Sequence, residues 1–136
     1  MPIEWRDKLS VGDPTLDADH KNLIKIINEF EEKADAGFDR QVLSETLKRL
    51  MGYAKEHFAR EERLQARITY PYYDRHCQEH RRLLRDVEGH IRTYMEDTST
   101  EIDGEVKLAM LHFLRDWLIN HIIEQDLKMR PFLGVS

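Results

Sequence analysis

The residues with the clearest chemistry are histidines and carboxylates that recur at the spacing of one helical turn. His57 and Glu61 are four residues apart, and so are His76 and His80. On an ideal helix, side chains four residues apart differ by about 40° in rotation and by roughly 6 Å along the axis, so both can reach one metal ion. We therefore interpret both pairs as candidate metal ligands.

Three further polar groups fall on stripes that are otherwise apolar. His20 precedes Leu23 and Ile27 by three and seven residues, which places it on the same helix face. His121 follows one turn after Leu118, and Asp126 comes five residues later. Burying so many polar side chains is unfavourable unless each finds a partner, and a metal centre would satisfy all of them together.

The number of these ligands indicates two metals. Seven groups exceed what one iron or zinc accepts from protein, yet they leave two metals short of saturation. A carboxylate can bridge two metals and a neutral imidazole cannot, so Glu61 and Asp126 are the natural bridges. If the histidines divide three and two, and a solvent-derived oxygen also bridges, one metal is six-coordinate and the other keeps an open position for a small ligand.

Four stretches with apolar residues at helical spacing are predicted to carry these groups. The first contains Leu23, Ile27, Phe30 and Ala34; the second Leu43, Leu47, Leu50, Ala54 and Phe58; the third Leu84, Val87, Ile91 and Tyr94; and the fourth Val106, Met110, Phe113, Trp117 and Leu118. The predicted breaks are short: Gly37, residues 68–73 with Pro71, and residues 97–104. Such short connections favour antiparallel neighbours, so we expect an all-α, up-down-up-down four-helix bundle.

The rest of the chain fits one domain. Residues 1–136 are predicted to form a single domain, with an irregular arm from Met1 to about Asp17 packed on the bundle.

A net charge of -5, with positive and negative residues interleaved, argues against nucleic acid as a partner. No apolar run approaches the roughly 20 residues of a membrane span, and Cys77 has no partner for an internal disulfide. We expect a cytoplasmic protein with no membrane association.

From Trp5 to about Pro131, the ordered set of motifs resembles the hemerythrin family and its bacterial single-domain relatives. The matching elements are Trp5, Ser10-Val11-Gly12, Asp17, His20, Tyr53, His57-Phe58, Glu61-Glu62, Tyr70-Pro71, His76, His80, Trp117-Leu118, His121-Ile122 and Asp126. Each motif alone is a weak signal, but their order and spacing together are specific.

The resemblance implies a non-haem di-iron centre that binds O2 reversibly. The ligands that it implies are His76, His80 and His121 on the saturated iron, His20 and His57 on the open iron, and Glu61, Asp126 and an oxo or hydroxo group as bridges. By the family's mechanism, each ferrous iron gives O2 one electron, and the bridging hydroxide gives it a proton. O2 is then held as a hydroperoxide on the five-coordinate iron, a position that small anions such as azide also occupy.

An apolar pocket must protect that ligand. The candidates by matching position are Leu23, Phe58, Trp117, Leu118 and Ile122, although spacing alone makes each an ordinary core residue, and Phe58 in particular. Gln65 is a further candidate. Gln65 stands where the family commonly has methionine; it either lines the pocket or turns outward at the helix end. Asp19 stands where relatives often have glutamine; it is either a hydrogen-bond acceptor behind the metal ligands or, in the interpretation we prefer, a solvated acid of the first helical turn. The spacing of five between His121 and Asp126 separates them by about 140° on an ideal helix, so a π-type widening is expected there.

Two classes of function remain open. The first is an O2 carrier, store or sensor without enzymatic activity, and the second is a di-iron oxidase, peroxidase or nitric-oxide-handling enzyme. Bundle enzymes that activate oxygen typically use four carboxylates and two histidines, often as Glu-x-x-His pairs, which this chain lacks. Metal storage or a structural zinc site is a third reading, which the unsaturated ligand count disfavours. The sequence does not identify a protein partner.

Overall fold

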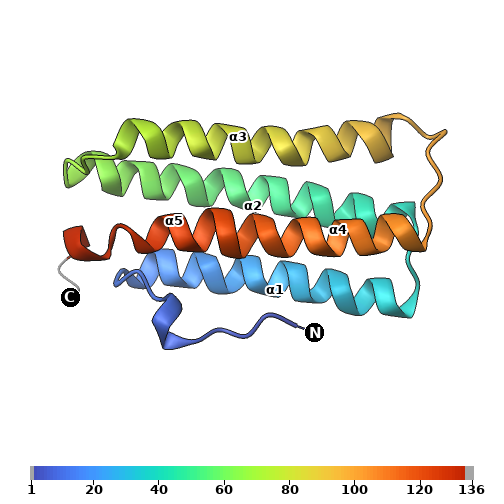
Figure 1. Cartoon of the computed structure of the whole chain (residues 1–136), viewed down its shortest axis with the longest axis horizontal. Helices are drawn as coiled ribbons and strands as arrows, with labels where there is room; N and C mark the ends of the chain where they lie inside the picture. Colours follow the sequence, from blue (N-terminus) through green and yellow to red (C-terminus); the bar gives the residue numbers. More distant parts are fainter. Residues whose placement is uncertain (1, 134–136) are drawn as a thin grey trace.

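The computed structural model describes residues 2–133, and these form a bundle of four antiparallel helical rods (Figure 1). The helices are α1 (Pro14–Ala36), α2 (Arg40–Arg67), α3 (Tyr73–Ile91), α4 (Gly104–Asp116) and α5 (Glu124–Leu127). The π-helical segment η2 (Arg92–Glu96) extends α3, and the π-helical segment η3 (Trp117–Ile123) joins α4 to α5 in one rod. Short 3-10 turns occupy η1 (Asp7–Leu9) and η4 (Arg130–Leu133). The predicted all-α, up-down-up-down topology is confirmed.

Three aspartates cap the N-termini of α1, α2 and α4. Each carboxylate accepts a hydrogen bond from the backbone N–H three residues on: Asp13 from Leu16 at 3.0 Å, Asp39 from Val42 at 2.8 Å and Asp103 from Val106 at 3.0 Å. Such a cap contributes roughly 1 kcal/mol by satisfying a backbone donor that the helix leaves free. The predicted breaks at Gly37, at residues 68–73 and at residues 97–104 agree with the starts of α2, α3 and α4.

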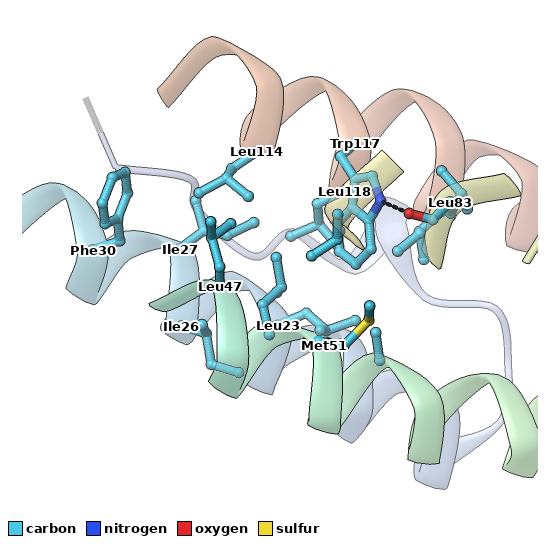
Figure 2. Packing of buried hydrophobic residues seen from close by; sticks show 14 of the residues in the cluster. Leu23, Ile26, Ile27, Phe30, Leu47, Met51, Leu83, Leu114, Trp117 and Leu118 are labelled. Atoms are coloured by element: carbon cyan, nitrogen blue, oxygen red, sulfur yellow. Dashed lines mark hydrogen bonds between the residues drawn. The ribbon is translucent and has the colours of Figure 1, made fainter. Parts of the chain in front are cut away.

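Buried apolar side chains form a large core cluster and a smaller one, which contains Val11, Leu16, Tyr70 and Met129. Figure 2 shows Leu23 and Ile27 of α1 against Leu47 of α2 and Leu118 of η3, and all four are fully buried. Trp117 is also buried, and its indole N–H donates to the backbone oxygen of Leu83 at 3.0 Å. This bond satisfies the polar atom of a large ring and ties the fourth rod to α3.

The N-terminal arm packs on α1, but it is shorter than predicted. Ile3 exchanges two backbone hydrogen bonds with the Asn28 side chain, both of 2.8 Å. Residues 14–17, which we assigned to the arm, form the first turn of α1 because Asp13 caps the helix and Pro14 suits its first position. Met1, the first residue assigned to the arm, lies outside the described residues. Within residues 2–133, no helix is long and apolar enough to cross a membrane.

Candidate metal centre

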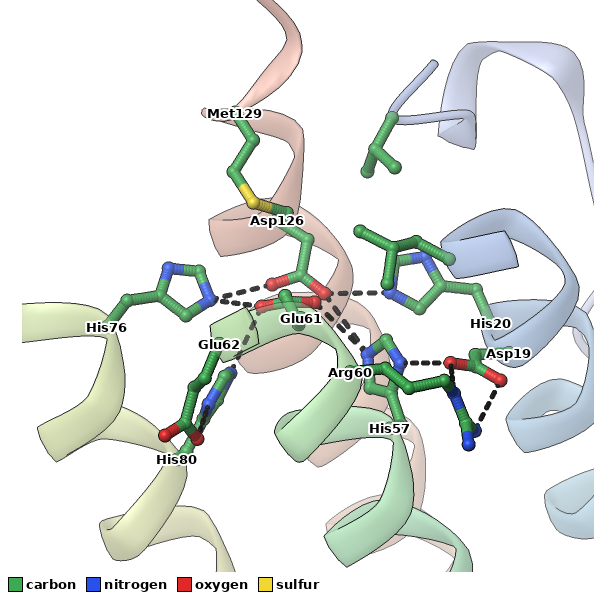
Figure 3. A network of polar contacts seen from close by, with 12 residues as sticks. Asp19, His20, His57, Arg60, Glu61, Glu62, His76, His80, Asp126 and Met129 are labelled. Carbon is green, nitrogen blue, oxygen red and sulfur yellow. Dashed lines mark hydrogen bonds and ion pairs between the residues drawn. The ribbon is translucent and has the colours of Figure 1, made fainter. Parts of the chain in front are cut away.

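Six of the seven predicted ligands converge inside the bundle (Figure 3). They are His20 of α1, His57 and Glu61 of α2, His76 and His80 of α3, and Asp126 of α5. All six are buried, with exposed fractions of 6 % or less. All four rods of the bundle therefore contribute side chains to one polar cluster.

The two carboxylates lie at the centre of this cluster, between the histidines. Asp126 places Oδ2 at 2.7 Å from Nε2 of His20 and Oδ1 at 2.9 Å from Nε2 of His76. Glu61 places Oε1 at 2.6 Å from Nε2 of His76 and at 3.1 Å from Nε2 of His80. Its Oε2 lies 3.2 Å from Nε2 of His57. Each carboxylate thus faces histidines on both sides.

The donor atoms form two groups that share both carboxylates. His20 and His57 belong to one group, His76 and His80 belong to the other, and Glu61 and Asp126 belong to both. Within each group the four donor atoms lie within 4.8 Å of one another. This arrangement is that of two adjacent cation sites bridged by two carboxylates, and it is consistent with a di-metal centre of hemerythrin type.

Buried atoms without a partner support the same reading. His20 Nδ1, His57 Nε2 and Glu61 Oε2 are buried and make no hydrogen bond. The last two are 3.2 Å apart, but they are not aligned as donor and acceptor. A buried polar atom without a partner costs about 1–3 kcal/mol, and a cation beside Glu61 and His57 would remove that cost. The donor set of the chain therefore fits bound cations.

Mutual contacts shift the pKa values of the histidines and of Glu61 in the cluster. Burial by itself raises the pKa of Glu61, yet the imidazoles of His57, His76 and His80 beside it hold that pKa well below the ordinary value. Burial lowers the pKa of His57, but Asp126, Asp19 and Glu61 raise it well above 6.5. Burial also lowers the pKa of His76, but hydrogen bonds with Asp126 and Glu61 raise it to about 10. Protonated His57 and His76 therefore balance the charge of ionised Glu61, and metal ions would replace those protons.

Asp19 is part of the site, and our interpretation of it as a solvated acid is wrong. Its side chain is buried, and Oδ2 lies 2.9 Å from Nδ1 of His57. Arg60 donates to both carboxylate oxygens at 2.8 and 2.7 Å, and Tyr53 donates to Oδ1 at 2.7 Å. Burial raises the pKa of Asp19, but these three partners hold it well below the ordinary value. Only the pairing of α1 with α2 brings Arg60 to Asp19.

Glu62 has an equivalent role on the other side, which sequence reasoning missed. Its Oε2 lies 2.9 Å from Nδ1 of His80, and its Oε1 accepts a hydrogen bond of 3.3 Å from the Cys77 thiol. A carboxylate on the outer nitrogen of a ligand histidine orients the ring and increases its basicity. Glu62 directly follows Glu61, off the inward stripe, so the sequence offered no signal beyond its place in the family motif.

His121 lies outside the converged cluster, and its role as the seventh ligand stays a prediction. Its side chain is 37 % exposed, with Nε2 at 3.2 Å from Asp116 and Nδ1 at 3.7 Å from Glu79. The expected π-helical widening is present, but it ends at Ile123. Only part of the interval to Asp126 is therefore widened, and buried Ile122 and Ile123 take the inward positions instead.

The predicted pocket residues are all buried, Gln65 included. Leu23, Phe58, Trp117, Leu118 and Ile122 are at most 2 % exposed. The Phe58 ring stacks on His80 with the ring centroids 4.0 Å apart. The alternative that Gln65 turns outward is wrong, because its amide N–H donates to the Met129 sulfur at 3.1 Å and its Oε1 is buried without a partner.

Comparison with known proteins agrees with the fold and the site. The profile of the hemerythrin HHE cation binding domain matches residues 11–133. A bacteriohemerythrin of Pseudomonas aeruginosa is 29% identical over 126 residues, which are 91% of this chain and 76% of the relative. A myohemerythrin of Theromyzon tessulatum is 27% identical over 129 residues, covering 95% and 92% of the two chains. A crystal structure of a hemerythrin point mutant superposes with a TM-score of 0.81 at 23% identity, covering 99% of this chain and all of that one.

These observations define a helical-bundle protein with a buried histidine and carboxylate cluster for cations. The chain belongs to the hemerythrin HHE cation-binding family.

Proposed function

We propose that the chain binds O2 reversibly at a di-iron centre, as a carrier, store or sensor of O2 and not as an enzyme. The observation that carries this proposal is the sharing of Glu61 and Asp126 between two histidine pairs. His20 and His57 would hold one iron, and His76 and His80 the other, with the carboxylates bridging. Two irons bound there would supply one electron each to O2 and recover both on release.

The composition of the donor set supports a binder over an oxidase. The converged ligands are four histidines and two carboxylates. Fewer anionic ligands stabilise high-valent iron less, so such a centre is a weaker oxidant and a better reversible binder. The names of the relatives, bacteriohemerythrin and myohemerythrin, agree with this assignment.

His121 is the proposed seventh ligand, on the iron held by His76 and His80. The family resemblance is its support, since its imidazole contacts Asp116 and Glu79 in the structure. Those groups are partly exposed, and ion pairs between such groups are weak, roughly 0–1 kcal/mol. To recruit His121, iron would have to displace these weak contacts, together with that of Arg82 with Nδ1 at 3.2 Å, and draw the imidazole inward.

The surroundings of the cluster are suited to holding O2 without loss. Leu23, Leu118 and Ile122 are buried apolar side chains at matching positions in the family. Such walls exclude water, and Asp19 holds the outer nitrogen of His57 so that its inner nitrogen faces the cluster. We place the protein in the cytoplasm, which the single free cysteine supports.

Anaerobic optical titration tests the proposal. The reduced iron-loaded protein is titrated with O2, and the O2 is then removed by argon flushing. Reversible binding predicts a visible absorption band that grows to a stoichiometric end point and disappears on flushing, over repeated cycles. Steady consumption of O2 with added reductant, without a stable coloured form, would instead identify an oxidase.

A further inference from the structure

A cavity of about 570 Å³ lies beside the candidate centre, at the end of the bundle where the α2–α3 connection approaches α5. This volume is within the usual range of small-molecule sites. Its lining includes Tyr70, Tyr72, Arg75, His76, Glu79 and Lys128.

One residue belongs both to this cavity and to the candidate centre. His76 lines the cavity, and its Nε2 contacts Glu61 and Asp126 on the inner side. It is 6 % exposed, whereas the other five converged residues are 3 % exposed or less. The cavity therefore reaches a residue of the cluster itself.

Aromatic rings lead from the surface to His76. Tyr72 is 50% exposed, and its ring centroid lies 5.7 Å from that of buried Tyr70. The Tyr70 ring lies 6.2 Å from the His76 imidazole, also edge to face. Exposed rings stack well on planar ligands. Because electron transfer weakens steeply with distance, a ligand on these rings is well placed to exchange electrons with the cluster through short steps.

The charges around the cavity favour an anion. Arg75 and Lys128 have no carboxylate within ion-pair distance among the residues that the structure describes. The one acidic lining residue, Glu79, is already held by Arg82, whose Nε donates to it at 3.0 Å. The Arg75 guanidinium lies 5.9 Å from the centroid of the exposed Tyr72 ring, and Lys128 Nζ donates to Gln125 Oε1 at 3.2 Å. Two cations without a carboxylate partner beside this ring suit a molecule with a planar aromatic part and a phosphate or carboxylate group.

We propose that this cavity binds reduced flavin mononucleotide, or a planar aromatic anion of the same class, as the electron donor that restores the ferrous state. The inference rests on the proposed di-iron function. In the step, the flavin hydroquinone anion becomes oxidised flavin and releases one proton to solvent and two electrons, one for each ferric ion. Tyr72 and Tyr70 contact the flavin ring, and Arg75 and Lys128 hold the phosphate.

Flavin fluorescence tests the binding without reference to O2. Titrating the chain as purified into flavin mononucleotide is expected to quench the fluorescence saturably. Lys128→Glu and Tyr72→Ala should each weaken binding about tenfold, the size expected for one charge-assisted contact or one stacking contact. Lys48→Glu, the same charge change on exposed α2, is the matched control and should leave binding unchanged.

Two further ligands separate the contributions of the ring and the phosphate. Riboflavin, which lacks the phosphate, should bind about tenfold more weakly and should be insensitive to Lys128→Glu. Inorganic phosphate should compete only at much higher concentration. The cavity assignment is overturned if quenching is absent, if Lys48→Glu weakens binding equally, or if riboflavin fails to bind while phosphate displaces the nucleotide fully.

Reduction kinetics test the donor role separately. Reduced flavin mononucleotide below saturation should reduce the ferric iron-loaded protein about tenfold more slowly in Lys128→Glu than in the unmodified chain. Methyl viologen radical, a cation, should not be slowed by Lys128→Glu. Equal rates with the flavin would disprove the donor role even where binding is seen. Failure of O2 binding alone would disprove the proposed function and leave the fluorescence result standing.

Discussion

The Asp19 carboxylate lies 2.9 Å from Nδ1 of His57 inside the bundle, and this contact decides which ring nitrogen faces the metal site. A carboxylate accepts a hydrogen bond, so Nδ1 keeps its proton and Nε2 is the nitrogen that would give up a proton to bind a metal. Arg60 and Tyr53 hold Asp19 in turn. A layer of charged residues outside the ligands therefore fixes the orientation of His57.

Replacing Asp19 should weaken metal binding without removing a ligand. Asp19→Ala is expected to lower iron affinity by about 10–100-fold, the usual effect of losing the partner of a ligand histidine. Competition against a chelator measures this change. Asp35→Ala, on the same helix but largely exposed, is the control and should have no effect. An affinity of Asp19→Ala equal to that of the unmodified chain would remove Asp19 from the site.

Iron content tests the two shared carboxylates. The chain purified with iron available is expected to hold about two irons, since two donor groups share Glu61 and Asp126. Glu61→Gln should lower the iron content below one per chain. A neutral amide lacks the negative charge with which the carboxylate would bridge two cations. Glu56→Gln, exposed on the same helix, should retain both. A reproducible content of one iron in the unmodified chain would contradict the di-iron assignment.

The iron-free protein should lose stability as the pH rises above neutrality. His76 has a folded-state pKa of about 10 against an ordinary value of 6.5, so its ion pairs stabilise the fold fully below 6.5 and are lost as the pH rises towards 10. The stabilisation from Glu61, whose pKa is lowered, is present above its ordinary value of 4.5 and is lost at lower pH. Iron competes with protons for the same atoms, so the gain in Tm on loading should increase with pH.

Thermal melts at several pH values, with and without iron, measure this dependence. His76→Gln should flatten the decline of the iron-free chain between pH 6.5 and 10, whereas exposed His112→Gln should not. Equal midpoints with and without iron at pH 8 would mean that the cluster does not bind the metal.

Substitution of His121 decides between six protein ligands and seven. Because the resemblance assigns it to an iron, His121→Ala should release one iron more readily and shift the absorption of the azide-bound ferric form. Exposed His112→Ala is the control on the same rod. An unchanged spectrum and unchanged iron content would show that the six converged residues suffice and that His121 belongs to the surface pair with Asp116.

Gln65 should limit the lifetime of the oxygenated form. Its buried amide is four residues after Glu61, and its Oε1 lacks a hydrogen-bond partner. A buried acceptor of this kind favours the entry of a water molecule or another donor near the bound ligand. Protonation and escape of the reduced oxygen species would then be easier. Gln65→Met is expected to slow the optical decay of the oxygenated form, and exposed Gln41→Met should not alter it. A decay in Gln65→Met that is unchanged or faster would exclude this role.

Helix spacing accounts for most of what could be predicted of the fold and the site. The pairs at four-residue spacing on α2 and α3 converge as expected, because one helix alone fixes the relation between its members. The single discrepancy among the ligands, His121, occurs where the helix is irregular. A π-helical segment changes the rotation per residue, and its exact extent depends on packing against the other rods.

The sequence by itself determined the four helices, their breaks and the inward stripes that carry His20, His57, Glu61, His76, His80 and Asp126, since apolar periodicity and capping act within one segment. Only the tertiary structure decided the contacts between segments. The burial of Asp19 against Arg60, the contact of Glu62 with His80 and the outward position of His121 all depend on how neighbouring helices are rotated and offset. Those quantities are set by packing across the whole bundle, because residues distant in sequence fix them together.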